Sequence, residues 1–199
     1  MDARLTLRRL LCGAAIVALV STASACGGGR GAAQSAAKVP RLLTYSSSNL
    51  SFSYPAAWTA YSSHKWWTFH FSPLVYLSTQ PVHNPCSTKG NETTCGFPVQ
   101  RLRPGGVLAV WQFGQVPITG SIRLTGKQIR VDGHHAGLEE TTGGECRRIG
   151  ADRTIEADVE LGDDGVIFLT ACLRGPNLAR AEKSVEALLA STRFPSQQT

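Results

Sequence analysis

Hydrophobic and polar residues alternate along much of the chain, with the period of two that is typical of half-buried β-strands. In 49–54, Leu50, Phe52 and Tyr54 alternate with serines. Most of the other extended segments are dense in aromatic and β-branched residues, which favour strands. The pattern predicts strands over 41–46, 49–54, 66–71, 74–78, 107–113, 128–131, 136–142, 153–161 and 166–174, with short extended pieces from Trp58 and over 121–124.

Two turn signals connect predicted strands. Asp132-Gly133 ends the strand 128–131. Asp163-Asp164-Gly165 is typical of a β-hairpin, so the strands on either side of it are expected to pair antiparallel.

The last element is predicted to be an amphipathic helix of about four turns that begins after Asn177, its expected N-cap. Its apolar residues recur at spacings of three and four, whereas charged residues of both signs occupy the opposite face. Because this polar face is balanced in charge rather than basic, we expect the helix to pack on a sheet and not on a membrane surface. The apolar stripe consists of Leu178, Ala181, Val185, Leu188 and Leu189.

The segment 80–106 differs from the rest of the chain. It contains Pro81, Pro85, Pro98 and Pro104 together with several Gly, Asn and Thr residues. It is therefore predicted to be one long loop. Long loops in compact domains are often functional, so this segment is the first place to expect a binding surface.

The first 25 residues predict a signal peptide. Three arginines precede the apolar stretch Leu10–Val20, which is too short to span a membrane and is typical of a cleaved leader. The context of Cys26, with small residues before it and glycines after it, resembles a bacterial lipobox, in which the cysteine is lipidated and becomes the new N-terminus. The predicted location is the extracytoplasmic face of the cytoplasmic membrane, with the lipid as anchor.

Two alternatives to this processing remain open. Ala23-Ser24-Ala25 also satisfies the rule for ordinary secretory cleavage, and the leucine usual three residues before a lipobox cysteine is missing. Arg8-Arg9 resembles a twin-arginine export signal, so the sequence does not decide the export route.

The length of the chain after the leader is that of one domain. After the leader, residues 26–40 are predicted to form a flexible tether, 41–195 a globular domain and 196–199 a tail.

The full chain of 199 residues has a formal net charge of +6, and it holds no long run of Lys or Arg. This mild, dispersed basicity argues against nucleic acid as a partner.

Cysteine usage agrees with an oxidising compartment. Cys12 lies in the leader and Cys26 is the predicted anchor, which leaves an even number of cysteines and implies two disulfides. Three connectivities are possible. We expect the first pair to staple the loop 80–106 and the second to join two later strands, which gives Cys86–Cys95 and Cys146–Cys172.

A metal site is the alternative for the first pair, since His83 lies three residues before Cys86. Zinc sites normally place two to four residues between paired cysteines, and the spacing here is wider. No metal and no cofactor are therefore predicted.

Phe52-Ser53-Tyr54-Pro55-Ala56-Ala57-Trp58 resembles the opening of PsbP-like domains, which actinobacterial lipoproteins of the LpqN/LpqT kind share. The turn after Val131 and the closing segment 188–194 fit the same plan, whereas His134-His135 replaces a proline common in the family. The resemblance implies an α+β fold, an antiparallel sheet packed against helices in an α/β sandwich. It also implies a binding or assembly accessory rather than an enzyme.

Candidate chemistry is sparse. His134 and His135, with Glu139 and Glu140, are the nearest approach to a metal or acid–base cluster. On a strand, the two glutamates point to opposite faces, so at most one of them joins the histidines. An exposed polar turn is the simpler interpretation.

Aromatic residues offer a second candidate site. Trp66 and Trp67 are adjacent on a predicted strand, so one of them must face away from the core. An exposed tryptophan could stack on a sugar ring, although core packing also explains these residues.

The sequence thus predicts a lipid-anchored extracytoplasmic accessory protein without catalytic activity, which binds a protein or an envelope component through the loop 80–106. The alternative is a carrier of carbohydrate or glycolipid. An envelope hydrolase that uses His134 and Glu139 is a third hypothesis. The identity of the ligand or partner and the oligomeric state do not follow from the sequence.

Overall fold

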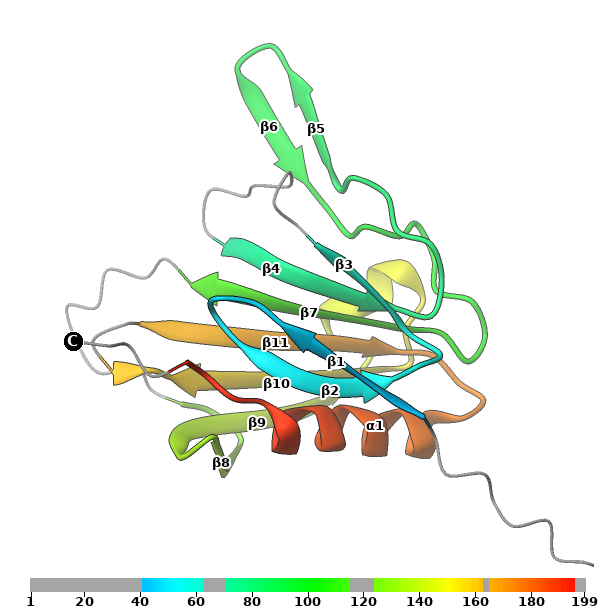
Figure 1. The fold of residues 1–199 in the computed structure, drawn as a ribbon. Coiled ribbons are helices and arrows are strands. Elements are labelled where there is room, and N and C mark those ends of the chain that lie inside the picture. The colour runs from blue at the N-terminus through cyan, green and yellow to red at the C-terminus, as the bar shows by residue number, and fades with distance from the viewer. Residues whose placement is uncertain (1–40, 63–70, 115–123, 163–164, 196–199) are drawn as a thin grey trace, which may run out of the picture. The chain divides into compact units, whose positions relative to one another are not determined.

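A seven-stranded sheet organises the fold, with the strand order β3–β4–β7–β11–β10–β9–β8 and every neighbouring pair antiparallel (Figure 1). The computed structural model describes residues 41–62, 71–114, 124–162 and 165–195. The sheet strands are β3 Thr59–Ser62, β4 Phe71–Ser78, β7 Val107–Gly114, β8 Lys127–Val131, β9 His134–Thr142, β10 Arg153–Glu160 and β11 Val166–Leu173.

One face of this sheet is covered by a hairpin and a helix. The hairpin consists of β1 (Leu42–Ser46) and β2 (Ser51–Pro55), and the helix is α1 (Leu178–Ser191), which lies beside β2 (Figure 1). After the helix, the chain forms a bridge to β2, because Ser51 and Arg193 exchange two backbone hydrogen bonds of 2.9 and 2.8 Å. The first hairpin and the last helix therefore form one layer.

The main hydrophobic core lies between this layer and the sheet. Alternate residues of β2, β7, β11 and α1 point into it, as their period-two and helical patterns require. Phe52 and Trp111 are 1% and 0% exposed, and Leu188 of α1 is fully buried. The predicted helix and its apolar stripe are confirmed, with Asn177 as N-cap and Val185, Leu188 and Leu189 buried.

A tight turn joins β8 to β9 and is tied to the end of the chain. Asp132 and Gly133 have φ angles of 51° and 84°, as in the turns with two positive φ angles that suit right-twisted hairpins. The Asp132 carboxylate accepts a hydrogen bond of 2.8 Å from the backbone N–H of Phe194. It also pairs with the Arg193 guanidinium at 3.6 Å. The ring of Phe194 in turn contacts His134 edge-on, with ring centroids 5.5 Å apart.

The opposite face of the sheet carries a smaller core, and the segment 80–106 and a short helix cover part of it. The short helix is η1 (Glu145–Ile149), a 3₁₀ helix. Leu102 donates a backbone hydrogen bond of 2.8 Å to Ile149, so the two coverings are joined. This second core comprises Tyr76, Val99, Leu102, Leu108, Cys146, Ile149, Ala151 and Cys172.

Two expectations need correction. The segment 80–106 is not one irregular loop, because it contains the hairpin β5 (Cys86–Lys89) and β6 (Glu92–Cys95). Gly90, with φ of 65°, takes the first central position of the turn, where glycine avoids a steric cost. Cys146 lies in η1 and not in a strand, because Gly143 and Gly144 end β9 with positive φ angles.

The α+β class is confirmed, with a predominantly antiparallel sheet and one α-helix in the part of the chain that the structure describes. The predicted antiparallel pairing of the strands before and after Gly165 is also confirmed, since β10 and β11 pair from Arg153 with Leu173 to Glu160 with Val166. Most of the predicted strand 121–124 lies outside the described residues.

Candidate binding cleft

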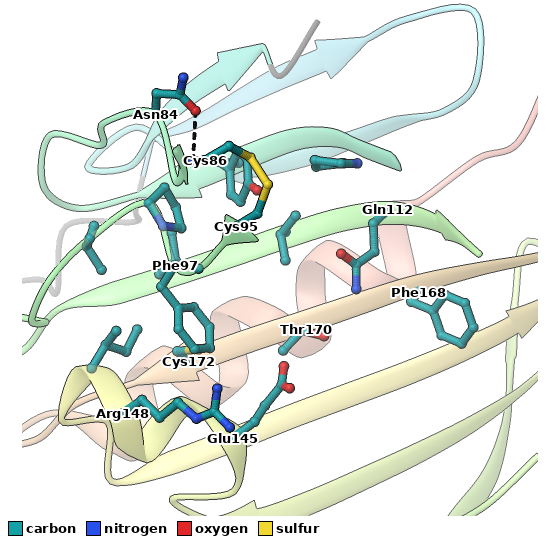
Figure 2. Close-up of a pocket in the computed structure, with 18 of the residues that line it drawn as sticks. Asn84, Cys86, Cys95, Phe97, Gln112, Glu145, Arg148, Phe168, Thr170 and Cys172 are labelled. Atoms are coloured by element: carbon teal, nitrogen blue, oxygen red, sulfur yellow. Dashed lines mark hydrogen bonds between the residues drawn. A yellow bond between two sulfur atoms is a disulfide. The ribbon is translucent and has the colours of Figure 1, made fainter. Parts of the chain in front are cut away.

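A cleft of about 1480 Å³ opens on the sheet face that α1 does not cover. Its floor consists of residues from β4, β7, β11 and β10, and its walls come from the β5–β6 hairpin with the following segment 96–99 on one side and η1 on the other. Figure 2 shows Gln112, Phe168 and Thr170 on the strands of the floor, with the Cys86–Cys95 disulfide on the hairpin side. The cleft is thus built where the sheet remains open between its two partial coverings.

The first wall is held together by local polar contacts and a disulfide. Cys86 and Cys95 form the expected bond, with an S–S distance of 2.08 Å, at the first and last residue pair of the hairpin. Asn84 accepts a hydrogen bond of 2.9 Å from the backbone N–H of Cys86. Beyond the disulfide-bonded end of the hairpin, the two flanking segments remain paired. The backbone N–H of His83 donates a hydrogen bond of 2.9 Å to the carbonyl of Pro98. The segment therefore has a fixed shape without a hydrophobic core of its own.

The second wall is joined to the floor by the other disulfide. Cys146 of η1 is bonded to Cys172 of β11, with an S–S distance of 1.92 Å, and both residues are at most 1% exposed. The two predicted disulfides are therefore present, one on each side of the cleft. Arg174 also donates a hydrogen bond to the carbonyl of Leu102, which holds segment 97–103 against the end of β11.

The strand register arranges the floor in rows that cross the sheet. One row of the floor runs through Tyr76, Val110, Thr170 and Glu156, on β4, β7, β11 and β10 in turn, and continues beyond the cleft to Glu139 on β9. Residues in register on neighbouring antiparallel strands point to the same face. The floor thus changes across the sheet, from a phenol and an aliphatic side chain to a hydroxyl and then to the carboxylate of Glu156.

Two carboxylates of the floor, Glu156 and Asp158, lie in an environment that disfavours their charged forms. Burial raises the pKa of Glu156 above its ordinary value of 4.5, and the negative charges of Glu145, Asp158 and Glu139 raise it further. Burial and the charge of Glu139 likewise raise the pKa of Asp158 above 3.8. Ionisable groups with perturbed pKa values in a cleft are typical of functional sites.

Tyr76 lies at the other end of the row and is 6% exposed. Burial raises the pKa of its phenol to about 12, so it stays neutral at physiological pH. Tyr76 therefore adds no charge to the cleft, and the apolar lining residues Val99, Leu108, Val110 and Phe97 belong to the same hydrophobic cluster.

The predicted His–Glu cluster is not assembled. His134 contacts Phe194, whereas the His135 ring lies 3.3 Å from the Arg130 guanidinium at the β8–β9 turn. Glu140 pairs with Arg153 at 3.1 Å, and Glu139 accepts a hydrogen bond of 3.3 Å from Thr125. The two glutamates lie on opposite faces of β9, as alternation requires. None of these four residues lines the cleft.

Three other predicted site residues, Cys26, Trp66 and Trp67, lie outside the described residues. Glu156 and Asp158 were missed as site residues, because a polar side chain on alternate positions of a strand is usually a solvated face. The available signal was the repetition of acidic residues at 156, 158 and 160 on one face of a single strand.

Comparison with known proteins does not identify a family. No protein-family model matches the chain, and no curated protein sequence matches it. The described residues contain no group of three or more His, Cys, Asp or Glu side chains placed to hold a metal ion. Among the helices in the described ranges, none combines the length and the apolar character that crossing a membrane requires.

Proposed function

We propose that this protein is a lipid-anchored extracytoplasmic binding protein without catalytic activity, and that it binds a protein or an envelope component in the cleft. The observation that carries the proposal is the cleft itself. Two disulfides fix its walls over an open sheet face, and carboxylates with raised pKa values lie on its floor. The buried carboxylates cost stability, and a binding role accounts for their position.

A surface cleft favours partner binding over carriage of a ligand in the interior. The space between the sheet and α1 is filled by large side chains such as Phe52, Trp111 and Leu188, which are at most 1% exposed. The open site has a volume above the 300–1,000 Å³ that is usual for small-molecule pockets. A segment of a larger partner suits such a site better than a single sugar or lipid does.

The proposal includes kinship with PsbP-like domains. It is supported by the residues that carry the resemblance, because Phe52, Tyr54 and Trp58 are all at most 8% exposed and belong to the main core. The antiparallel sheet with a closing helix is consistent with that family's plan.

Crosslinking in the producing bacterium tests the binding role. A photoreactive amino acid replaces Thr93, an exposed residue of the cleft wall, in the full chain. The matched control carries it at Glu186, an exposed residue of α1. We expect a discrete adduct at position 93 that is absent at position 186. The same adduct pattern at both positions would contradict the proposal.

The anchor is tested separately by intact mass and fractionation. We expect the mature chain to begin at Cys26 and to carry the mass of two or three acyl chains, since two chains suffice for stable anchoring. Cys26→Ser should move the protein from the membrane to the soluble extracytoplasmic fraction. An unacylated mature chain would overturn the anchor and leave the cleft unaffected.

A further inference from the structure

The two ends of the cleft differ in charge. The described residues that line it include three carboxylates, Glu145, Glu156 and Asp158, and one guanidinium, that of Arg148, for a net charge of −2. The full chain, in contrast, has a net charge of +6. The cleft is therefore a local site of negative charge on a basic protein, and it attracts cations.

The acidic floor lacks protein counter-ions in the part of the chain that the structure describes. The three ion pairs found there join Arg153 to Glu140, Arg153 to Glu182, and Arg193 to Asp132. Neither Glu156 nor Asp158 takes part in any of them. Burial and the repulsion of neighbouring carboxylates raise both pKa values, and a cation bound at this position would favour the charged forms against them.

The opposite end offers apolar contact. Tyr76, Val99 and Leu108 are 6%, 3% and 2% exposed, and they form a packed base for the half-buried side chains of Val110 and Phe97. Figure 2 shows Phe97 projecting from the wall over this part of the sheet. An aliphatic or aromatic group placed here would be removed from water on several sides.

The distance between these ends sets the size of the occupant. Tyr76 on β4 and Glu156 on β10 are separated by β7 and β11, that is, by three strand spacings. Each spacing is about 4.8 Å, which gives a separation of about 14 Å. About four residues of extended chain cover this length.

We infer that the cleft takes a cationic segment of a partner protein, with apolar side chains over Tyr76 and Val110 and a Lys or Arg at Glu156 and Asp158. This inference rests on the proposed function, because it specifies the chemistry of the partner that the cleft binds. The charge of the floor selects a basic segment, and the neutral end selects its apolar neighbours.

Fluorescence polarisation with synthetic peptides tests the inference on the full chain. The probe is a labelled octapeptide with leucine and tyrosine in one half and lysine in the other. One control peptide replaces the lysines with glutamates, and a second replaces leucine and tyrosine with serine. We expect the probe to bind more tightly than either control, and its affinity to fall as salt screens the charges.

Two substitutions locate the binding. Glu156→Gln should weaken binding of the probe about tenfold, whereas Glu186→Gln, which makes the same change of charge on α1, should leave it unchanged. Val110→Thr keeps the shape of the side chain but replaces a methyl group with a hydroxyl at the apolar end, and a severalfold loss of affinity is expected. Thermal unfolding of each variant shows that it remains folded.

The inference would be overturned if the lysine and glutamate peptides bound with equal affinity, or if the probe did not bind. Neither outcome would change the crosslinking result at Thr93. An equal effect of Glu156→Gln and Glu186→Gln would overturn the inference as well. The binding role in the proposed function fails if the crosslinks at positions 93 and 186 are the same, and the peptide experiments do not bear on that outcome.

Discussion

Glu156 on β10 lies directly opposite Glu139 on β9 in the antiparallel register, so two carboxylates occupy adjacent positions on the open face of the sheet. Like charges placed directly opposite each other on neighbouring strands destabilise a sheet. Glu145 and Asp158 add further negative charge around Glu156. The fold therefore keeps an arrangement that costs stability at the edge of the cleft, which Glu156 lines.

The first prediction concerns the pH dependence of stability. Because the pKa of Glu156 is above 4.5 in the folded state, the folded protein holds this proton more tightly than the unfolded chain does. Stability contributed by Glu156 is thus present at low pH and lost as pH rises through the folded-state pKa. We expect Glu156→Gln to raise the melting temperature at about pH 7, with the gain disappearing below about pH 4.

Circular dichroism across this pH range measures the effect, and Glu186→Gln is its control. Glu186 is exposed on α1, and the same substitution there should shift the melting temperature little at any pH. A lower melting temperature for Glu156→Gln at neutral pH would show that its carboxylate stabilises the fold.

The second prediction concerns the disulfides. Cys146 and Cys172 are separated by 26 residues and Cys86 and Cys95 by 9. In the chain-entropy model, removing the longer link costs about 3.5 kcal/mol and removing the shorter one about 2.6 kcal/mol. Denaturant unfolding of Cys146→Ala/Cys172→Ala and of Cys86→Ala/Cys95→Ala compares the two. Equal stability of the wild type and the first double variant would contradict this expectation.

The third prediction concerns Asp132, which joins the β8–β9 turn to the residues after α1. Asp132→Ala removes the acceptor for the Phe194 N–H and the partner of Arg193, and it places alanine at a φ of 51°. We expect a loss of about 1–3 kcal/mol in the free energy of unfolding. Asp132→Asn keeps an oxygen acceptor and tolerates the left-handed backbone, so its loss should be clearly smaller. Denaturant titration distinguishes the two variants.

The fourth prediction concerns the docking of α1 on the main core. Leu188 is fully buried, so Leu188→Ala should lower the free energy of unfolding by about 2–5 kcal/mol, including the cavity it leaves. Ala187→Ser, at an exposed position one residue earlier, should change it by less than about 0.5 kcal/mol. A small effect of Leu188→Ala would mean that α1 contributes little to the core.

Much of the fold could be predicted because it rests on local periodicity. Period two identified β2 and β10, the hairpin signal before Val166 identified β11, and the spacing of apolar residues identified α1. The Asp132-Gly133 turn marked the end of β8. The cysteine pairing was also predicted, because the first pair brackets a turn-rich loop and the second pair then follows. The hairpin β5–β6 was missed because its strands are polar on both faces and carry no alternation.

The sequence by itself thus determined most of the secondary structure, the α+β class and the two disulfides, because each depends on neighbouring residues or on a small set of possible pairings. Only the tertiary structure decided where the site lies. The row from Tyr76 through Val110 to Glu156 joins residues that are far apart in the chain, and strand order and register bring them together. The pKa shifts of Glu156 and Asp158 depend on burial and on charges from η1 and β9, which no local pattern encodes.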